Sequence, residues 1–343
     1  MNSRERVLAA LRREPVDRAP VVNPTNAATE DLMDLAGAAF PRAHRDPELM
    51  ARLAATAHTE LGFDSVMPVY SIVQEASALG CPIDWGEKGD WPTVTAPLWR
   101  EPEEIRIPPG FLTHPDTRCV LDAIRLLRKR FGSEVAVIGK TMGPWTHAYH
   151  GFGVQQFLLM SVDDPDKTKR CLDRLKEATV QFGLAQIEAG ADALTLPDHA
   201  TGDLVSGAYY ARFLFDVHRE MAARLPAPLI LHICGRTLDR MDHIARTGMA
   251  AFHFDSKNDA AKAMAVVGRR MALAGNVNNP VTLLRKGPVE VRAEVWNCLR
   301  AGVQLIAPEC AVPLQTPVAN LKAIVAAVRE FGPGSRGLPR AGA

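Results

Sequence analysis

The chain has 343 residues, 47% of them hydrophobic, which suits one large α/β barrel as well as two domains. Its 40 basic and 39 acidic residues leave a net charge of +1, so we expect no nucleic-acid partner. We expect a cytoplasmic protein, because the six cysteines are widely spaced and the charged N-terminus is unlike a signal peptide. We expect no membrane span, because no apolar run approaches about 20 residues.

In chain order, a charged amphipathic helix at residues 1–18 precedes short apolar segments, which alternate with amphipathic helices in the later part of the chain. Strands are predicted at residues 19–22, 64–69, 134–140, 191–197, 228–234, 250–255, 271–275 and 303–307. Helices are predicted between the later strands at residues 164–188, 207–224, 236–246, 260–267, 289–301 and 317–331. This alternation predicts a parallel (β/α)8 TIM barrel with an N-terminal helical extension.

One segment interrupts the alternation early in the chain. At about residues 80–115, Pro and Gly are frequent, and Trp85, Trp91 and Trp99 fall in expected loops, so we predict an insertion or lid after the second strand. Residues 1–331 are expected to form a single barrel domain. Residues 332–343, rich in Gly, Pro, Arg and Ala, are expected to be a flexible tail.

Two segments carry soft metal ligands where predicted strands end. His232 and Cys234 in LILHICG share one face of a strand, because side chains alternate along it, and Cys310 ends IAPEC. One imidazole and two thiolates make a zinc set with an open fourth position, which is typical of catalytic zinc. Inert core cysteines are the alternative for the pattern alone. The barrel favours zinc, because both segments would reach its C-terminal face, where the active sites of such barrels lie.

Other polar or small residues follow the same ends of predicted strands. Candidates for binding a substrate are Gly143, Asp198, Asn276 and Asn278. We expect Asp255 to support catalysis there and to complete the metal shell when no substrate is bound. An acidic residue after a strand can also be a helix N-cap and nothing more, as expected for Asp203 and Asp259. Glu309 stays open between a fourth metal ligand and a solvent-facing side chain.

Several motifs, in register over most of the chain, resemble the uroporphyrinogen decarboxylase superfamily. GKTMGPWTHA is similar to its GPFT-like segment, LPDHATGDLVS to its DPxATGDLIS-like segment, and LAGNVNNPVTLL to its GNV(D/N)P segment. The HxC…C motif of His232, Cys234 and Cys310 resembles the branch of methylcobamide:coenzyme M methyltransferases. The decarboxylase branch fits less well, because its arginine-bearing signature should follow the first strand, where this chain has NPTNAATED.

The resemblance implies that zinc supports transfer of a methyl group from a methylcorrinoid co-substrate to a thiol or similar acceptor. A thiol has a free pKa of about 8.5, and bound to zinc it is deprotonated yet nucleophilic. The binding residues proposed above would then hold the corrinoid or the acceptor. Two departures bear on the acceptor, namely APECAVP without the usual glycine before Cys310, and an extra asparagine in NVNNP. Coenzyme M, another thiol and a folate all stay open as acceptors.

The corrinoid is expected on a separate partner protein. Asp216 and His218 begin the DxHxxG pattern of corrinoid-binding domains, but Met221 replaces its glycine, so the chain has no such site of its own. Three alternatives stay open: a metal-free tetrapyrrole decarboxylase, a non-catalytic barrel that binds corrinoid or zinc, and reverse methyl flow from a methyl-sulfur or methoxy donor.

Overall fold

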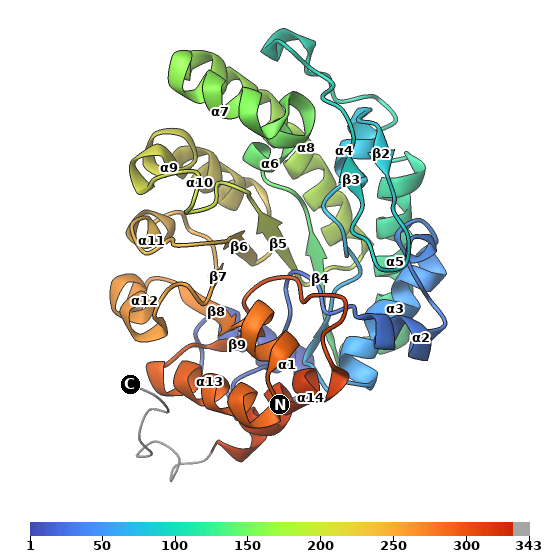
Figure 1. Ribbon diagram of the computed structural model, residues 1–343, viewed down its shortest axis with the longest axis vertical. Coiled ribbons are helices and arrows are strands. Elements are labelled where there is room, and N and C mark those ends of the chain that lie inside the picture. The colour runs from blue at the N-terminus through green and yellow to red at the C-terminus, as the bar shows by residue number, and fades with distance from the viewer. Residues whose placement is uncertain (332–343) are drawn as a thin grey trace.

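The structure is a computed structural model that describes residues 1–331, so the tail predicted at 332–343 lies outside the described residues. A curved parallel sheet forms its centre, and helices surround the sheet on the outside (Figure 1). The sheet contains, in spatial order, β1 (Ser65–Val66), β4 (Ala136–Lys140), β5 (Ala193–Pro197), β6 (Leu229–Ile233), β7 (Ala251–Phe254), β8 (Ala272–Val277) and β9 (Leu305–Pro308). Within the described residues, no helix has the length and apolar character required to cross a membrane.

The strand predicted first, at residues 19–22, is reduced to a single parallel bridge between Val21 and Ile306 of β9. The Val22 N–H donates to the Ile306 carbonyl at 2.9 Å, and the Ile306 N–H donates to the Pro20 carbonyl at 2.9 Å. On the other side, the Asp64 N–H donates to the Val21 carbonyl at 2.7 Å. These contacts put residues 20–22 between β9 and β1, and the predicted barrel is confirmed. Pro20 lacks an N–H, which limits pairing of this segment.

The helices follow the predicted alternation with a few local differences. They are α1 (Ser3–Leu11), α2 (Glu30–Ala36), α3 (Pro47–Thr59), α4 (Gln74–Leu79), α5 (Pro115–Phe131), α6 (Pro144–Phe152), α7 (Val154–Asp163), α8 (Pro165–Ala189), α9 (Gly207–Phe213), α10 (Phe215–Arg224), α11 (Met241–Ile244), α12 (Ala260–Val267), α13 (Pro288–Ala301) and α14 (Val318–Glu330). Short 3-10 turns, η1 (Arg42–His44) and η2 (Pro102–Glu104), and a π-turn, η3 (Asn279–Leu283), complete the set.

Three helix predictions need correction. The N-terminal helix ends at Leu11 instead of residue 18, since Pro15 soon follows and disfavours helix before it. The helix predicted at 207–224 is divided into α9 and α10. The helix predicted at 236–246 shrinks to α11, because the Asn258 side chain accepts hydrogen bonds from the backbone N–H groups of Thr237 and Leu238 at 2.8 and 3.1 Å and holds them in a loop.

The segment predicted as an insertion carries an antiparallel hairpin of β2 (Ile83–Asp84) and β3 (Thr93–Val94). Trp99, after the hairpin, is buried and its ring centroid lies 5.7 Å from that of Phe152. Gly151 makes room for this indole, because a Cβ at that position would meet the ring at 2.0 Å. The insertion is therefore packed onto α6, and its role as a lid stays a prediction.

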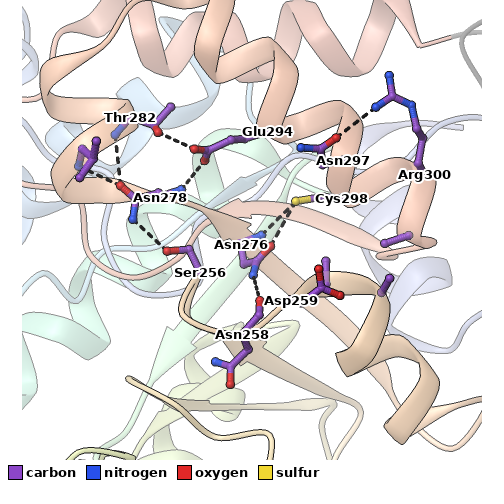
Figure 2. Close-up of a pocket in the computed structure, with 14 residues that line it drawn as sticks. Ser256, Asn258, Asp259, Asn276, Asn278, Thr282, Glu294, Asn297, Cys298 and Arg300 are labelled. Atoms are coloured by element: carbon purple, nitrogen blue, oxygen red, sulfur yellow. Dashed lines mark hydrogen bonds between the residues drawn. The ribbon is translucent and has the colours of Figure 1, made fainter. Parts of the chain in front are cut away.

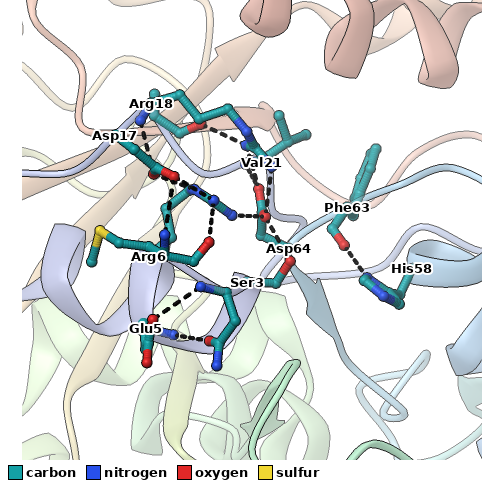
Figure 3. Close-up of polar contacts among 12 residues, drawn as sticks. Ser3, Glu5, Arg6, Asp17, Arg18, Val21, His58, Phe63 and Asp64 are labelled. Atoms are coloured by element: carbon teal, nitrogen blue, oxygen red, sulfur yellow. Dashed lines mark hydrogen bonds and ion pairs between the residues drawn. The ribbon is translucent and has the colours of Figure 1, made fainter.

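The N-terminal end of the barrel is tied together by the fully buried carboxylate of Asp64, just before β1 (Figure 3). Its Oδ1 accepts hydrogen bonds from Ser3 Oγ and Arg6 Nη1, both at 2.8 Å. Its Oδ2 accepts from Arg18 Nη1 and the Val21 N–H, also at 2.8 Å. One carboxylate thus joins α1, residues 20–22 and β1. This junction lies at the end of the barrel opposite the C-terminal ends of the strands.

Candidate functional site

His232, Cys234 and Cys310 converge at the C-terminal ends of β6 and β9. His232 Nε2 lies 3.1 Å from Cys234 Sγ and 3.3 Å from Cys310 Sγ, and the two sulfurs are 3.6 Å apart. Tetrahedral zinc, with bonds of about 2.3 Å to sulfur and 2.0 Å to nitrogen, separates its ligand atoms by roughly 3.5–3.8 Å. The three atoms therefore have nearly the spacing of zinc ligands. Within the described part of the chain, theirs is the one cluster of this kind.

The imidazole of His232 is oriented by the neighbouring strand. Its Nδ1 lies 3.1 Å from the backbone carbonyl of His253, which can only accept, so Nδ1 carries a proton and Nε2 faces the sulfurs. The His253 ring donates in turn from Nε2 to the Pro308 carbonyl at 2.7 Å. Such outer contacts fix the tautomer and direction of zinc-binding histidines. β7 and the end of β9 thus prepare His232 as a ligand.

The pKa values of the two cysteines are shifted in opposite directions. The hydrogen bond between the two sulfurs and the neighbouring His232 hold the pKa of Cys310 well below its usual range. The same bond, together with burial, raises the pKa of Cys234. Burial disfavours a charged His232, yet the neighbouring Cys310 thiolate raises the pKa of the imidazole overall. The pKa values of the two cysteines are thus shifted in opposite directions, and a metal bound here would displace any proton left on either sulfur.

Asp255, which we predicted to support catalysis, holds the loop after β6. Its Oδ2 accepts a hydrogen bond from the Gly235 N–H at 2.9 Å, and its Oδ1 accepts one from the Lys257 N–H at 2.8 Å. Its carboxylate does not belong to the cluster of ligand atoms within 4.8 Å of one another. The contact with Gly235 fixes the backbone directly after Cys234, and a catalytic role for Asp255 stays a prediction.

Glu309 is buried beside Cys310 instead of facing solvent. Its Oε1 accepts from the Asn279 N–H at 2.9 Å, and its Oε2 accepts from the Ser256 N–H at 2.8 Å. Burial raises the pKa of this carboxyl. With both oxygens bound to backbone amides, Glu309 secures the loop that carries Cys310 and does not join the ligand cluster.

Asp198 and Gly143 lie against each other inside the protein. Asp198 is fully buried, its Oδ1 accepts from the Thr146 N–H at 2.8 Å, and its Oδ2 lies 3.0 Å from His218 Nε2. His218 Nδ1 is 2.9 Å from the Tyr210 hydroxyl. A Cβ on Gly143 would come within 2.3 Å of the Asp198 carboxyl carbon. Sequence reasoning missed this network, because His218 attracted notice only as part of an incomplete corrinoid motif.

We expect Asp198→Asn to lower the free energy of unfolding by roughly 2–4 kcal/mol, because it removes a buried charge that accepts two hydrogen bonds. Urea denaturation would measure the loss. The KM values for the methylcorrinoid and the thiol, the two substrates that the family resemblance implies, should stay near those of wild type. A variant of wild-type stability with a raised KM would instead make Asp198 a substrate-binding residue, as its position after a strand first indicated.

Asn276 and Asn278 line a pocket of about 750 Å³ beside α12 and α13 (Figure 2). Asn276 donates to the Asn258 carbonyl at 2.9 Å and accepts from the Cys298 thiol of α13 at 3.3 Å. The Asn278 N–H donates to Glu294 at 2.8 Å. None of the three soft ligands lines this pocket. Gly143 and Asp198 are buried against each other, whereas Asn276 and Asn278 face the outer helices. The four predicted binding residues therefore do not line this pocket together.

A smaller pocket, of about 370 Å³, lies between the hairpin segment 92–97 and α6. Tyr149, His150 and His199 contribute to its wall. Burial lowers the pKa of His199, and the charges of Asp198, His232 and Cys310 act on the same ring. The N–H of the preceding residue, Asp198, donates to the His232 carbonyl at 2.9 Å, so the chain at His199 lies next to the strand that carries His232. His199 stands in the LPDHATGD segment, where its neighbour Asp198 drew attention instead.

The chain is similar to known proteins over nearly its whole length. The uroporphyrinogen decarboxylase (URO-D) family profile matches residues 2–331. The methylcobamide:CoM methyltransferase MtaA of Methanosarcina barkeri is 36% identical over 330 residues, which cover 95% of this chain and 97% of that enzyme. The uroporphyrinogen decarboxylase of Alkalilimnicola ehrlichii is 30% identical over 314 residues, covering 86% and 84%. A solved structure described as a methyltransferase from Methanosarcina mazei superposes with a TM-score of 0.94 at 34% identity, covering 96% of this chain and 99% of that one.

Proposed function

The chain belongs to the uroporphyrinogen decarboxylase family, and from that premise we propose that it is a zinc-dependent methyltransferase that moves a methyl group between a methylcorrinoid and a thiol. Corrinoid-dependent methyl transfer is the activity named for its MtaA relative, which matches over nearly the whole chain. The observation that carries the proposal is the convergence of His232, Cys234 and Cys310, whose ligand atoms lie within 4.8 Å of one another.

The donor set suits zinc in chemistry as well as spacing. Two thiolates and one imidazole are preferred zinc ligands, and three protein ligands leave a fourth position for an acceptor. When bound there, zinc would lower the pKa of a thiol and keep it nucleophilic at neutral pH. The His253 carbonyl, Asp255 and Glu309 hold the three ligand-bearing segments through backbone and ring contacts. The chain thus supplies a preorganised site whose ligands need little rearrangement on binding.

We further propose that the corrinoid arrives on a separate protein and that this chain acts in the cytoplasm. The supporting observations are the incomplete DxHxxG pattern, in which Met221 replaces glycine, and the free thiols of both cysteine ligands. The pocket lined by His199 is our candidate for the entry of the acceptor, because His199 is influenced by the charges of His232 and Cys310.

A spectroscopic assay tests the proposed reaction. The zinc-loaded protein should convert methylcobalamin to cob(I)alamin, with a visible absorbance change, when a suitable thiol is present. The acceptor sulfur gains the methyl carbon, the carbon–cobalt bond breaks with its electron pair left on cobalt, and the thiol proton goes to solvent. The panel of acceptors should include coenzyme M, homocysteine, 2-mercaptoethanol and tetrahydrofolate. We expect at least one thiol to react.

Two results would contradict the proposal in different ways. Carbon dioxide release from uroporphyrinogen, with no cob(I)alamin from any acceptor, would assign the chain to the decarboxylase activity of its 30% identical relative. Reaction with tetrahydrofolate alone would keep methyl transfer but remove the thiol, because the acceptor atom of the folate is nitrogen.

A further inference from the structure

Cys234 and Cys310 are the two partly exposed cysteines of the chain, and their sulfur atoms are in direct contact at 3.6 Å. The other four cysteines are buried, namely Cys81, Cys119, Cys171 and Cys298. Two of these buried thiols contact backbone carbonyls, one contacts a methionine sulfur and one contacts an asparagine amide. Within residues 1–331, the one pair of cysteine sulfurs in contact is thus also the partly exposed pair.

The two sulfurs come from strands that are not neighbours, since β7 and β8 separate β6 from β9 in the sheet. The backbone beside each sulfur is nevertheless held in place. Asp255 accepts a hydrogen bond from the Gly235 N–H at 2.9 Å, and Glu309 accepts two from backbone N–H groups at 2.9 and 2.8 Å. A disulfide bond is about 2.05 Å long, so the sulfurs need to approach by roughly 1.5 Å. Rotation of the two short side chains covers this distance without breaking those backbone contacts.

A disulfide and a zinc ion exclude each other at this cluster. The thiolate is the form of cysteine that binds a metal, and a disulfide has no thiolate. A bond between Cys234 and Cys310 would leave His232 as the only ligand of the three. Zinc sites in proteins use three or four protein ligands, so one imidazole would not retain the metal. Oxidation of this pair would therefore empty the site.

We propose that Cys234 and Cys310 form a reversible disulfide that switches zinc binding off when the protein meets a peroxide. One thiol takes an oxygen atom from hydrogen peroxide and becomes a sulfenic acid, and the first water leaves. The second thiol attacks the sulfenic sulfur, the sulfur–sulfur bond forms, and the second water leaves. Two thiols lose two electrons and two protons in all, and the oxygen–oxygen bond of the peroxide breaks. In zinc-loaded protein the two protons come from solvent, and the zinc dication is released to solvent.

The switch rests on the proposed function in one respect, namely that the oxidised protein cannot transfer a methyl group. Formation of the bond depends only on the contact between the two sulfurs. Partly exposed disulfides are the readily reduced ones, and disulfides in cytosolic proteins are usually transient and catalytic or redox-sensing. A bond at this position is therefore suited to regulation.

Peptide mapping tests the bond itself. Zinc-free protein is treated with a small excess of hydrogen peroxide, alkylated, and digested with trypsin without reductant. Trypsin releases Cys234 in peptide 225–236 and Cys310 in peptide 301–322, and neither peptide contains another cysteine. We expect these two peptides to be joined and the other four of the six cysteines to be alkylated. Treatment with a phosphine reductant should separate the two peptides.

Zinc release and turnover test the consequence of the bond. Zinc-loaded protein treated with peroxide should release about one zinc ion per disulfide, as measured with a colorimetric chelator. Methyl transfer from methylcobalamin should fall by more than about 100-fold, as expected when a metal ligand is removed. Reduction with the phosphine, followed by addition of zinc, should restore both the bound metal and the rate.

Two variants assign the effect to this pair. In Cys310→Ser, peroxide should leave peptide 225–236 without a disulfide, because the partner sulfur is gone. Cys171→Ala is the matched control, because Cys171 is buried in α8 away from the cluster, and it should form the bond and release zinc as wild type does. The mapping of wild-type protein does not depend on how well either variant folds.

Three results would overturn the proposal: oxidation of Cys234 or Cys310 to a sulfinic or sulfonic acid without a disulfide, a disulfide between another pair, or zinc release while the two peptides stay separate. Mapping and turnover separate this failure from failure of the proposed function. Joined peptides in a protein that yields no cob(I)alamin with any acceptor would keep the disulfide and remove the methyltransferase. Methyl transfer that resists peroxide, with the peptides separate, would remove the switch and keep the methyltransferase.

Discussion

Replacing Cys310 by alanine is expected to strip the zinc and to lower the rate of methyl transfer by more than about 100-fold. Loss of a residue that only orients a metal ligand commonly costs 10–100-fold in affinity or activity, and Cys310 is itself a ligand in our account. It is also the cysteine whose pKa is held below its usual range, so its removal takes away the more acidic of the two thiols. Metal analysis of the dialysed protein and the methylcobalamin assay would measure both effects.

A matched control distinguishes this effect from general damage. Cys171 is fully buried in α8, where burial raises its pKa to about 12, and Cys171→Ala should keep its zinc. Cys310→Ala should unfold at a temperature close to wild type, because Cys310 is only partly buried in a loop after β9. Full zinc retention in Cys310→Ala would show that the cluster is not the metal site.

The largest expected loss of stability comes from Asp64→Ala. We expect the free energy of unfolding to fall by roughly 3–5 kcal/mol, since the change leaves Arg6 and Arg18 without their shared buried carboxylate. It also leaves the Val21 N–H without its acceptor at the junction that completes the barrel. Urea denaturation at neutral pH would measure the change.

Asp17→Ala is the comparison for Asp64, because Asp17 also pairs with Arg6 but is 44% exposed. Exposed ion pairs contribute little, so we expect a loss of about 1 kcal/mol or less. The folded fraction of Asp64→Ala should still bind zinc, because the metal ligands lie at the other end of the strands. Similar losses for the two aspartates would refute the structural role given to Asp64.

The sequence was sufficient to predict the barrel and to select the ligand cluster. Alternation along a strand puts His232 and Cys234 on one face, and the common direction of parallel strands brings Cys310 to the same end. Local detail was less accessible. The strand predicted at residues 19–22 forms only a single bridge, because Pro20 has no N–H to donate. Most of the helix predicted at 236–246 is a loop that the Asn258 side chain holds, and no local sequence pattern encodes a contact between such distant residues.

Side-chain direction explains why the other candidate residues were harder to place. A residue at a strand end can face the barrel interior or the outer helices, and a shift of one position reverses the face. Asn276 in β8 contacts Cys298 on the outer side, whereas His232 in β6 meets Cys310 within the ligand cluster.

The central claim, that a zinc ion held by His232, Cys234 and Cys310 receives the acceptor thiol, is tested most directly by X-ray absorption at the zinc edge. Without a thiol, we predict one bound zinc with two sulfur ligands at about 2.3 Å and at least one nitrogen. Addition of a thiol that supports turnover should raise the number of sulfur ligands to about three. An unchanged sulfur count in the presence of that thiol, or zinc without any sulfur ligand, would contradict the account.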